Sequence, residues 1–196
     1  GLTKISLPAQ IKTISANTFQ NCTNVTEADF STLDLSTFSA TLIGCAGIVS
    51  TDNVKFPAGL TKIPNKFFQN CSGLKEINLL PNITEIGEYA FASVGVIGLV
   101  IPDTVTKIGK YAFQSCKSLV YCKMPTFVDT LERNMFDGCS NLLRIELPAT
   151  TSSNLLGWSF FQDCVNLSEV TMPASITSLD SLAFYNAGVK YLDLSK

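Results

Sequence analysis

An internal repeat of about 23 residues constrains the fold of this chain more than any other feature of its sequence. Each repeat is anchored by an aromatic residue or leucine, followed three residues later by a small residue that is usually cysteine. Successive anchors lie 23, 26, 23, 22, 23, 25 and 23 residues apart, a regularity that chance does not produce. One repeat cannot bury its apolar side chains alone, so the repeats must stack as coils of a solenoid. The anchor pairs are Phe19/Cys22, Leu42/Cys45, Phe68/Cys71, Phe91/Val94, Phe113/Cys116, Phe136/Cys139, Phe161/Cys164 and Phe184/Ala187.

Each repeat also carries a short alternating segment that predicts a β-strand. Its form is L-x-x-I-x-L-P, as in residues 142–148. Stacking the coils would pair these strands in parallel, about 4.8 Å apart. Including residues 5–8 near the N-terminus, we expect about nine strands. The A-F-x-x-C segment, as in residues 112–116, has helical spacing and predicts one or two helical turns on the opposite side of the coil, with the phenylalanine directed inward.

Two parts of the chain depart from the repeat. Residues 149–154 are rich in threonine and serine and predict a loop. Residues 31–54 form a poor coil, for which we expect a local bulge or loop. The residues of that coil that stay in phase with the repeat are Leu42, Cys45, Ile48 and Val54.

The periodic cysteines are expected to be structural. Six of the seven share one column of the repeat, and Cys122 replaces a strand isoleucine. Val94 and Ala187 fill the same column in two repeats, and a metal or redox role would not tolerate them. A shortened segment with Gly95 or Gly188 follows each of these two residues, which we interpret as a turn that requires positive φ. Neighbouring coils are close enough for a disulfide in principle, but the ladder aligns the side chains in parallel, and we expect buried free thiols.

Composition excludes several function classes. Lysine and arginine number 14 against 16 acidic residues, without a basic run, so we expect no nucleic-acid partner. The chain contains no histidine, which removes Ser-His and Cys-His nucleophiles and the commonest zinc ligand. No apolar segment approaches the roughly 20 residues that span a bilayer. Glu27 and Asp29 share a face, as paired glycosidase carboxylates do, but an open sheet offers no apolar pocket to raise a pKa. We therefore expect no catalysis, no cofactor and no metal.

Five N-x-S/T sequons begin at Asn21, Asn24, Asn70, Asn82 and Asn166. Asparagine is a common turn residue, and we interpret these positions as turn chemistry. Glycosylation there would matter only if the chain comes from a secreting eukaryote.

The repeating unit I-x-x-x-A-F-x-x-C-x-x-L-x-x-I-x-L-P resembles the BspA-like leucine-rich repeats, also called the Treponema pallidum type. The resemblance covers the chain from about Leu2 to Lys196. It implies an α/β fold: a right-handed leucine-rich-repeat solenoid with a parallel sheet on the concave face and short helical turns on the convex face. Members of this family are typically surface-exposed or secreted, and several are similar to adhesins that bind host matrix proteins or other microbes. A cell-surface or extracellular location is therefore implied, although no targeting segment is visible.

The residues that flank each inward isoleucine face solvent on the concave sheet, because positions i and i+2 of a strand share a face. The first column runs Lys4, Glu27, Asn53, Glu76, Gly98, Tyr121, Arg144, Glu169 and Tyr191. The second column runs Ser6, Asp29, Lys55, Asn78, Val100, Lys123, Glu146, Thr171 and Asp193. Opposite charges on neighbouring strands, such as Arg144 with Glu169 and Lys123 with Glu146, predict modestly stabilising pairs.

Part of these columns predicts a partner-binding site. Gly98 and Val100 leave a shallow apolar spot beside Tyr121 and Arg144, and tyrosine and arginine are residue types that interface hot spots favour. The alternative is an ordinary solvated face. The predicted site consists of Gly98, Val100, Tyr121, Lys123, Arg144, Glu146 and Glu169.

Three functions fit these observations. The first is a surface or secreted module that binds a host matrix protein or a microbial surface protein. The second is a structural spacer without a ligand of its own, and the third is glycan binding on the concave face. We expect one domain over residues 1–196 with about eight repeats. Because the repeat pattern reaches both ends without a polar cap, we also expect a fragment of a longer chain or ends that self-associate.

Overall fold

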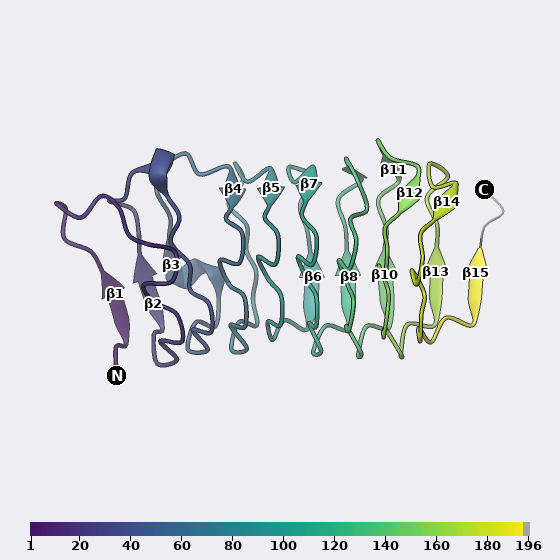
Figure 1. The fold of residues 1–196 in the computed structure, drawn as a ribbon, viewed down its shortest axis with the longest axis horizontal. Coiled ribbons are helices and arrows are strands. Elements are labelled where there is room, and N and C mark those ends of the chain that lie inside the picture. Colours follow the sequence, from purple (N-terminus) through teal and green to yellow (C-terminus); the bar gives the residue numbers. More distant parts are fainter. Residues whose placement is uncertain (194–196) are drawn as a thin grey trace.

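The computed structural model describes residues 1–193 as a stack of about eight coils along one axis (Figure 1). Most coils contribute a short strand to a lower row in Figure 1, a second short extended segment to an upper row, and a turn segment between them. The predicted leucine-rich-repeat solenoid with parallel strands is therefore confirmed.

The lower row, here called the main ladder, contains the L-x-x-I-x-L segments. Its strands form three separate parallel sheets, and within each sheet the inward residue of one strand aligns with that of the next, for example Leu99 with Cys122 and Cys122 with Ile145. Eight of the nine expected strands are present, and the ninth segment is reduced to a bridge between Ser50 and Glu76. The eight strands are β1 (Lys4–Ser6), β2 (Glu27–Asp29), β3 (Val54–Lys55), β6 (Gly98–Val100), β8 (Tyr121–Lys123), β10 (Arg144–Glu146), β13 (Glu169–Thr171) and β15 (Tyr191–Asp193).

The upper row is a second set of short parallel strands that the sequence analysis did not predict. It contains the aliphatic residues that lie five positions before the anchors, such as Ile63, Ile86 and Ile108, which pair in register. From β4 onward, each coil is thus hydrogen-bonded to its neighbours on two sides. The strands of this row are β4 (Lys62–Ile63), β5 (Glu85–Ile86), β7 (Lys107–Ile108), β9 (Phe127–Val128), β11 (Thr150–Thr151), β12 (Leu155–Leu156) and β14 (Ser178–Leu179).

The A-F-x-x-C segments form turns without a helix, so the expected helical turns are wrong. The described residues contain two short 3-10 helices, η1 (Leu35–Thr37) and η2 (Thr51–Asn53), and both lie outside these segments. In six consecutive coils the residues two before and two after the anchor have positive φ, as at Tyr111 (60°) and Ser115 (56°) around Phe113. Asn21 and Asn70, which begin two of the sequons, also adopt this left-handed conformation, in agreement with turn chemistry.

Hydrogen bonds between coils explain why these turns replace a helix. The Tyr111 and Phe113 N–H groups donate to the carbonyl groups of Arg133 and Met135 in the next coil, at 3.2 and 3.1 Å. The Ser115 N–H group donates in the same way to the carbonyl of Asp137, at 2.7 Å. The left-handed conformation costs an L-amino acid roughly 1–2 kcal/mol. In a helix these N–H groups would donate within their own segment, whereas here the left-handed conformation directs them to the neighbouring coil. The turn segments therefore form a third row of hydrogen bonds between coils, in addition to the main ladder and the upper row.

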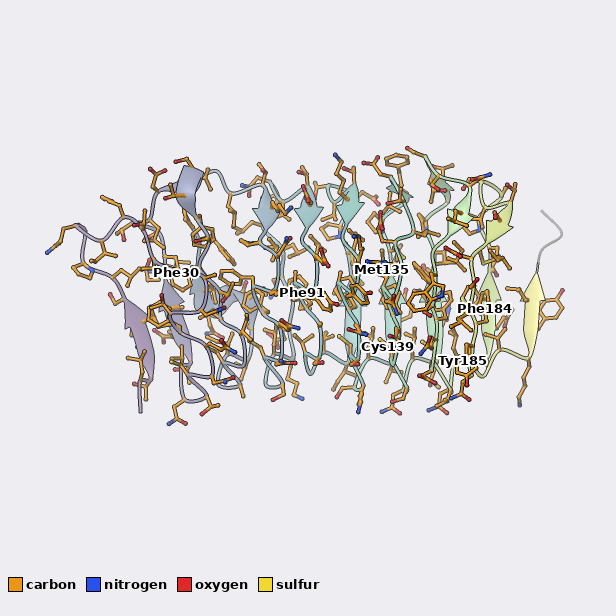
Figure 2. All side chains as sticks on the ribbon, in the orientation of Figure 1. Phe30, Phe91, Met135, Cys139, Phe184 and Tyr185 are labelled. Carbon is orange, nitrogen blue, oxygen red and sulfur yellow. The ribbon has the colours of Figure 1, made fainter. Side chains whose placement is uncertain are left out.

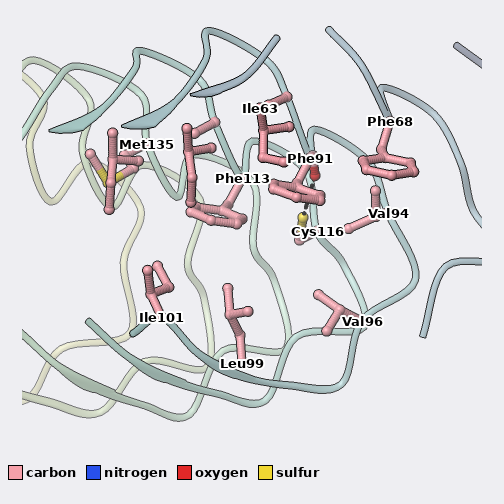
Figure 3. Packing of buried hydrophobic residues seen from close by; sticks show 14 of the residues in the cluster. Ile63, Phe68, Phe91, Val94, Val96, Leu99, Ile101, Phe113, Cys116 and Met135 are labelled. Carbon is pink, nitrogen blue, oxygen red and sulfur yellow. Dashed lines mark hydrogen bonds between the residues drawn. The ribbon is translucent and has the colours of Figure 1, made fainter. Parts of the chain in front are cut away.

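A continuous row of phenylalanine rings fills the interior. Phe91 and Phe184 lie along the middle of the stack together with Met135 (Figure 2). The six rings from Phe68 to Phe184 follow one another at centroid distances of 5.4 to 6.2 Å. Val96, Leu99 and Ile101 approach the rings from the opposite wall of the coil (Figure 3). The core is thus shared along the whole stack, as a solenoid requires.

The long anchor spacings have local causes. The spacing of 26 residues includes three extra residues, which fold as η2 and are capped by the Ser50 hydroxyl. The expected bulge in residues 31–54 is therefore confirmed, and its in-phase apolar residues are buried. As a result, Glu76 forms its β-bridge with Ser50. Asn53, which the first solvent-facing column places beside Glu76, is not its partner. In residues 149–154 the predicted loop is confirmed only in part, since Thr150–Thr151 forms β11.

Gly95 and Gly188 are needed for a different reason than positive φ, and the interpretation from the sequence is wrong. The positive-φ glycines are Gly44, Gly59 and Gly138. A Cβ atom at Gly95 would lie 2.2 Å from the Ser72 carbonyl oxygen of the preceding coil. Both glycines therefore permit close approach of two coils where the turn is one residue shorter.

Substitution Phe113→Ala should lower the free energy of unfolding by about 3–5 kcal/mol, because it leaves a cavity in the ring stack. Phe113 is fully buried between Phe91 and Phe136. Chemical denaturation of both variants would measure the effect, with Phe127→Ala as the control. Phe127 is partly exposed, so its loss should cost about 1 kcal/mol. Equal losses for the two variants would contradict the shared core.

Candidate functional site

The cysteine column offers no reactive thiol in its buried part. Cys71, Cys116 and Cys139 are buried, and each sulfur lies 3.0 to 3.2 Å from the carbonyl oxygen of the anchor residue one coil earlier. Figure 3 shows this contact between Cys116 and Phe91. Burial raises the pKa of Cys71 to about 12 and that of Cys45 to about 11, so these thiols stay protonated and donate hydrogen bonds. A thiol suits the position because it is small, largely apolar and still a donor.

The carboxylates that could suggest a glycosidase are held in the ionised form. Glu27 binds the Lys4 ammonium at 2.7 Å, and this hydrogen bond lowers the Glu27 pKa. Two hydrogen bonds from Ser31 lower the pKa of Asp29. A general acid needs the opposite shift. Among the described residues, no group of three or more Cys, Asp or Glu side chains is placed to hold a metal ion.

No helix in residues 1–193 has the length and apolar character needed to cross a membrane.

An apolar row that the sequence analysis missed lies at the entrance to strands β6, β8 and β10. Ile97, Val120 and Leu143 are 58%, 36% and 52% exposed and occupy equivalent positions in three successive coils. Their backbones are joined, since Val120 donates to the Ile97 carbonyl and Leu143 to the Val120 carbonyl. Most other coils carry a polar residue here, such as Thr26, Lys75 or Ser168, and the exposed Val49, whose carbonyl accepts from Lys75, is an exception. The repeat itself therefore does not require apolar residues at this position.

The predicted site residues of these three strands lie side by side next to that row. Gly98, Tyr121 and Arg144 are direct partners across the strands, as are Val100, Lys123 and Glu146. Val100 is 62% exposed, and a Cβ atom at Gly98 would meet nothing within 4 Å. The shallow apolar spot expected from the sequence therefore exists, and it is continuous with the row of Ile97, Val120 and Leu143.

Tyr121, Arg144 and Glu146 form one network on this surface. The Tyr121 hydroxyl donates to Glu146 Oε1 at 3.0 Å, and Arg144 Nη2 lies 2.9 Å from the same oxygen. The Arg144 guanidinium also lies 5.9 Å from the centre of the Tyr121 ring. Loss of solvent and the hydrogen bond to Glu146 raise the pKa of the Tyr121 phenol, so it remains a donor at neutral pH. Glu146 and Tyr121 thus fix the orientation of the Arg144 side chain.

The expected ion pairs across the strands are wrong. Arg144 pairs with Glu146 of its own strand, and neither Arg144–Glu169 nor Lys123–Glu146 occurs among the ion pairs of the described residues. Salt bridges between neighbouring strands of the main ladder occur instead at Lys4–Glu27 and Lys55–Asp29.

Glu169 is separated from the other site residues by a break in the main ladder. Strands β6, β8 and β10 form one hydrogen-bonded sheet, and β13 pairs only with β15 among the described strands. A groove of about 800 Å³ follows this break, lined by Arg144 and Glu146 on one side and by Glu169 and Thr171 on the other. We call the surface from Ile97 to this groove the β6–β10 face: Ile97, Gly98, Val100, Val120, Tyr121, Lys123, Leu143, Arg144 and Glu146.

The stacked coils, the parallel main ladder and the phenylalanine and cysteine columns define a leucine-rich-repeat protein. The family model of the BspA type leucine rich repeat region, which comprises six copies of the repeat, matches residues 1–119 and 93–196 of this chain. The chain belongs to this family.

Solved leucine-rich-repeat proteins share the fold. One from Bacteroides ovatus is 27% identical with a TM-score of 0.79, and the match covers 96% of this chain and 50% of that protein. One from T. pallidum is 25% identical with a TM-score of 0.64, covering 84% of this chain and 77% of that protein. One from Eubacterium ventriosum is 17% identical with a TM-score of 0.60, and the match covers 99% of this chain and 61% of that protein. The chain thus spans half the length of the B. ovatus protein. A search of curated proteins gave no match.

In the folded protein, Ellman's reagent should react readily only with Cys22, because Cys22 is partly exposed and the other six thiols are buried. After denaturation all seven should react. Rapid reaction of two or more thiols in the native state would contradict the burial of the other six cysteines. The Cys22→Ala variant serves as the control, since it should remove the fast phase and leave the slow phase unchanged.

Proposed function

We propose that this chain is a protein-binding module that engages its partner through the β6–β10 face. The observation that carries the proposal is the continuous exposed apolar row of Ile97, Val120 and Leu143 beside the preorganised Tyr121–Arg144 pair. An apolar centre with tyrosine and arginine, bordered by charged residues, has the composition of an interface hot spot. Because the repeat does not need these apolar residues, their exposure on one continuous surface favours a binding partner.

The partner class and location follow from the family. We infer an adhesin-like role toward a host matrix protein or a microbial surface protein, and a cell-surface or extracellular location. Glu169 belongs to the proposed site as the far wall of the groove that borders the face.

The double substitution Tyr121→Ala with Arg144→Glu should weaken partner binding at least tenfold, which corresponds to about 1.4 kcal/mol. A second variant, Gly98→Trp, should block the face without affecting the fold, because the space beside Gly98 is open. Surface plasmon resonance against purified fibronectin, laminin and collagen and against whole microbial cells would measure the effect.

Lys4→Ala with Glu27→Ala is the matched control, since it removes an exposed pair in the same columns outside the face. Its binding should equal that of the wild-type chain. Unchanged binding by both face variants would contradict the proposed site. Absence of binding to every protein and cell type in the panel would contradict the adhesin-like role and favour a spacer.

A further inference from the structure

We propose a second ligand site, a pyranose-binding pocket around Trp158 on the upper row of the solenoid. It is independent of the β6–β10 face, which lies on the main ladder along the lower row (Figure 1). Trp158 is the single tryptophan of the chain and is 39% exposed. The equivalent position is polar in the neighbouring coils, with Lys110, Arg133 and Ser181. The indole ring is therefore an exception to its column that packing does not require.

The pocket owes its shape to the two extra residues of this coil. Pro148 and Leu156 are eight residues apart, whereas the equivalent Pro173 and Leu179 are six apart. The added residues lie between β11 and β12, where the N–H groups of Ser152 and Ser153 both donate to the Asp129 carbonyl. Ser153 and Leu155 of this segment line a hollow of about 310 Å³. Its lining is Thr130, Leu131, Glu132, Arg133, Ser153, Leu155, Gly157, Trp158 and Asp180.

The pocket is rigid without a ligand. The Gly157 N–H group donates to the Leu131 carbonyl at 2.9 Å, and the Trp158 carbonyl accepts from Asn134 at 2.9 Å. A Cβ atom at Gly157 would lie 2.6 Å from the Leu131 oxygen, so only glycine allows this approach. The preceding coil thus fixes the backbone at Gly157 and Trp158. A preformed site reduces the ordering cost of binding a small ligand.

The chemistry of the lining selects a neutral polyhydroxylated ring. A pyranose has an apolar C–H face that can pack on an indole ring, and its hydroxyl groups need both donors and acceptors around the rim. Glu132 and Asp180 supply carboxylate acceptors and the Ser153 hydroxyl supplies a donor, whereas the Arg133 guanidinium lies over the Tyr111 ring of the preceding coil, 5.6 Å from its centre. Two carboxylates disfavour a phosphorylated ligand, and the alternative ligand is a cation, which choline tests. The volume lies near the lower end of the range of ~300–1,000 Å³ for small-molecule pockets, which fits one or two sugar rings.

Fluorescence of the single tryptophan reports on this pocket directly. We would titrate the whole chain with methyl glucoside, methyl galactoside, methyl mannoside and N-acetylglucosamine, with choline as a cationic probe. At least one sugar should produce a saturable change in emission, and choline should not. No change with any sugar, or a change with choline alone, would overturn the proposal.

Ligand-observed NMR extends the test to variants that lack the reporter. Trp158→Ala should weaken binding of the selected sugar at least tenfold, and Asp180→Asn should weaken it less. Tyr185→Ala is the matched control, because it removes an exposed aromatic ring elsewhere on the surface. Unaltered saturation transfer in Trp158→Ala, with an unchanged unfolding temperature, would refute the site. This result would not affect the proposed protein-binding face.

Discussion

Hydrogen bonds between successive coils hold this molecule together, because no coil closes a core of its own. They run along the main ladder, along the upper row, and through the left-handed turns around each anchor phenylalanine. The turns are unusual in that residues such as Tyr111 and Ser115 adopt positive φ in order to direct their N–H groups at the next coil. The phenylalanine stack and the cysteine column then fill an interior that is already defined by these bonds. Every outward position is left available for other purposes.

Function in such a solenoid must come from positions that the repeat does not determine. The β6–β10 face arises because three successive coils place Ile97, Val120 and Leu143 where most other coils place polar residues. The Trp158 pocket arises where two extra residues widen one coil. The first is a substitution on a regular ladder and gives a broad, flat surface. The second is an irregularity of the backbone and gives a small concave site, so the two surfaces suit ligands of different size.

The repeat predicted most of the fold. The position of each residue within its repeat was enough to predict that Gly98, Tyr121 and Arg144 are neighbours across strands. A fixed coil length combined with the two-residue alternation of a strand allows only one pairing register between neighbouring coils. It failed for the A-F-x-x-C turns, because helices and successive β-turns share local spacing and only bonds to the next coil distinguish them. The repeat also failed to predict the ion pairs, because Arg144 pairs with Glu146 of its own strand. Glu169 lies on the other side of the break between β10 and β13. Comparing the residue before each strand across coils would have found the apolar row.

Amide hydrogen exchange tests the central claim that the coils are bonded to one another on their third side. The N–H groups of Tyr111, Phe113 and Ser115 donate to the following coil, so they should exchange as slowly as that of Val120, which donates to Ile97 at the start of β8. Fast exchange of these three amides while Val120 stays protected would mean that the turns stand alone. The account of how the coils are joined would then be wrong.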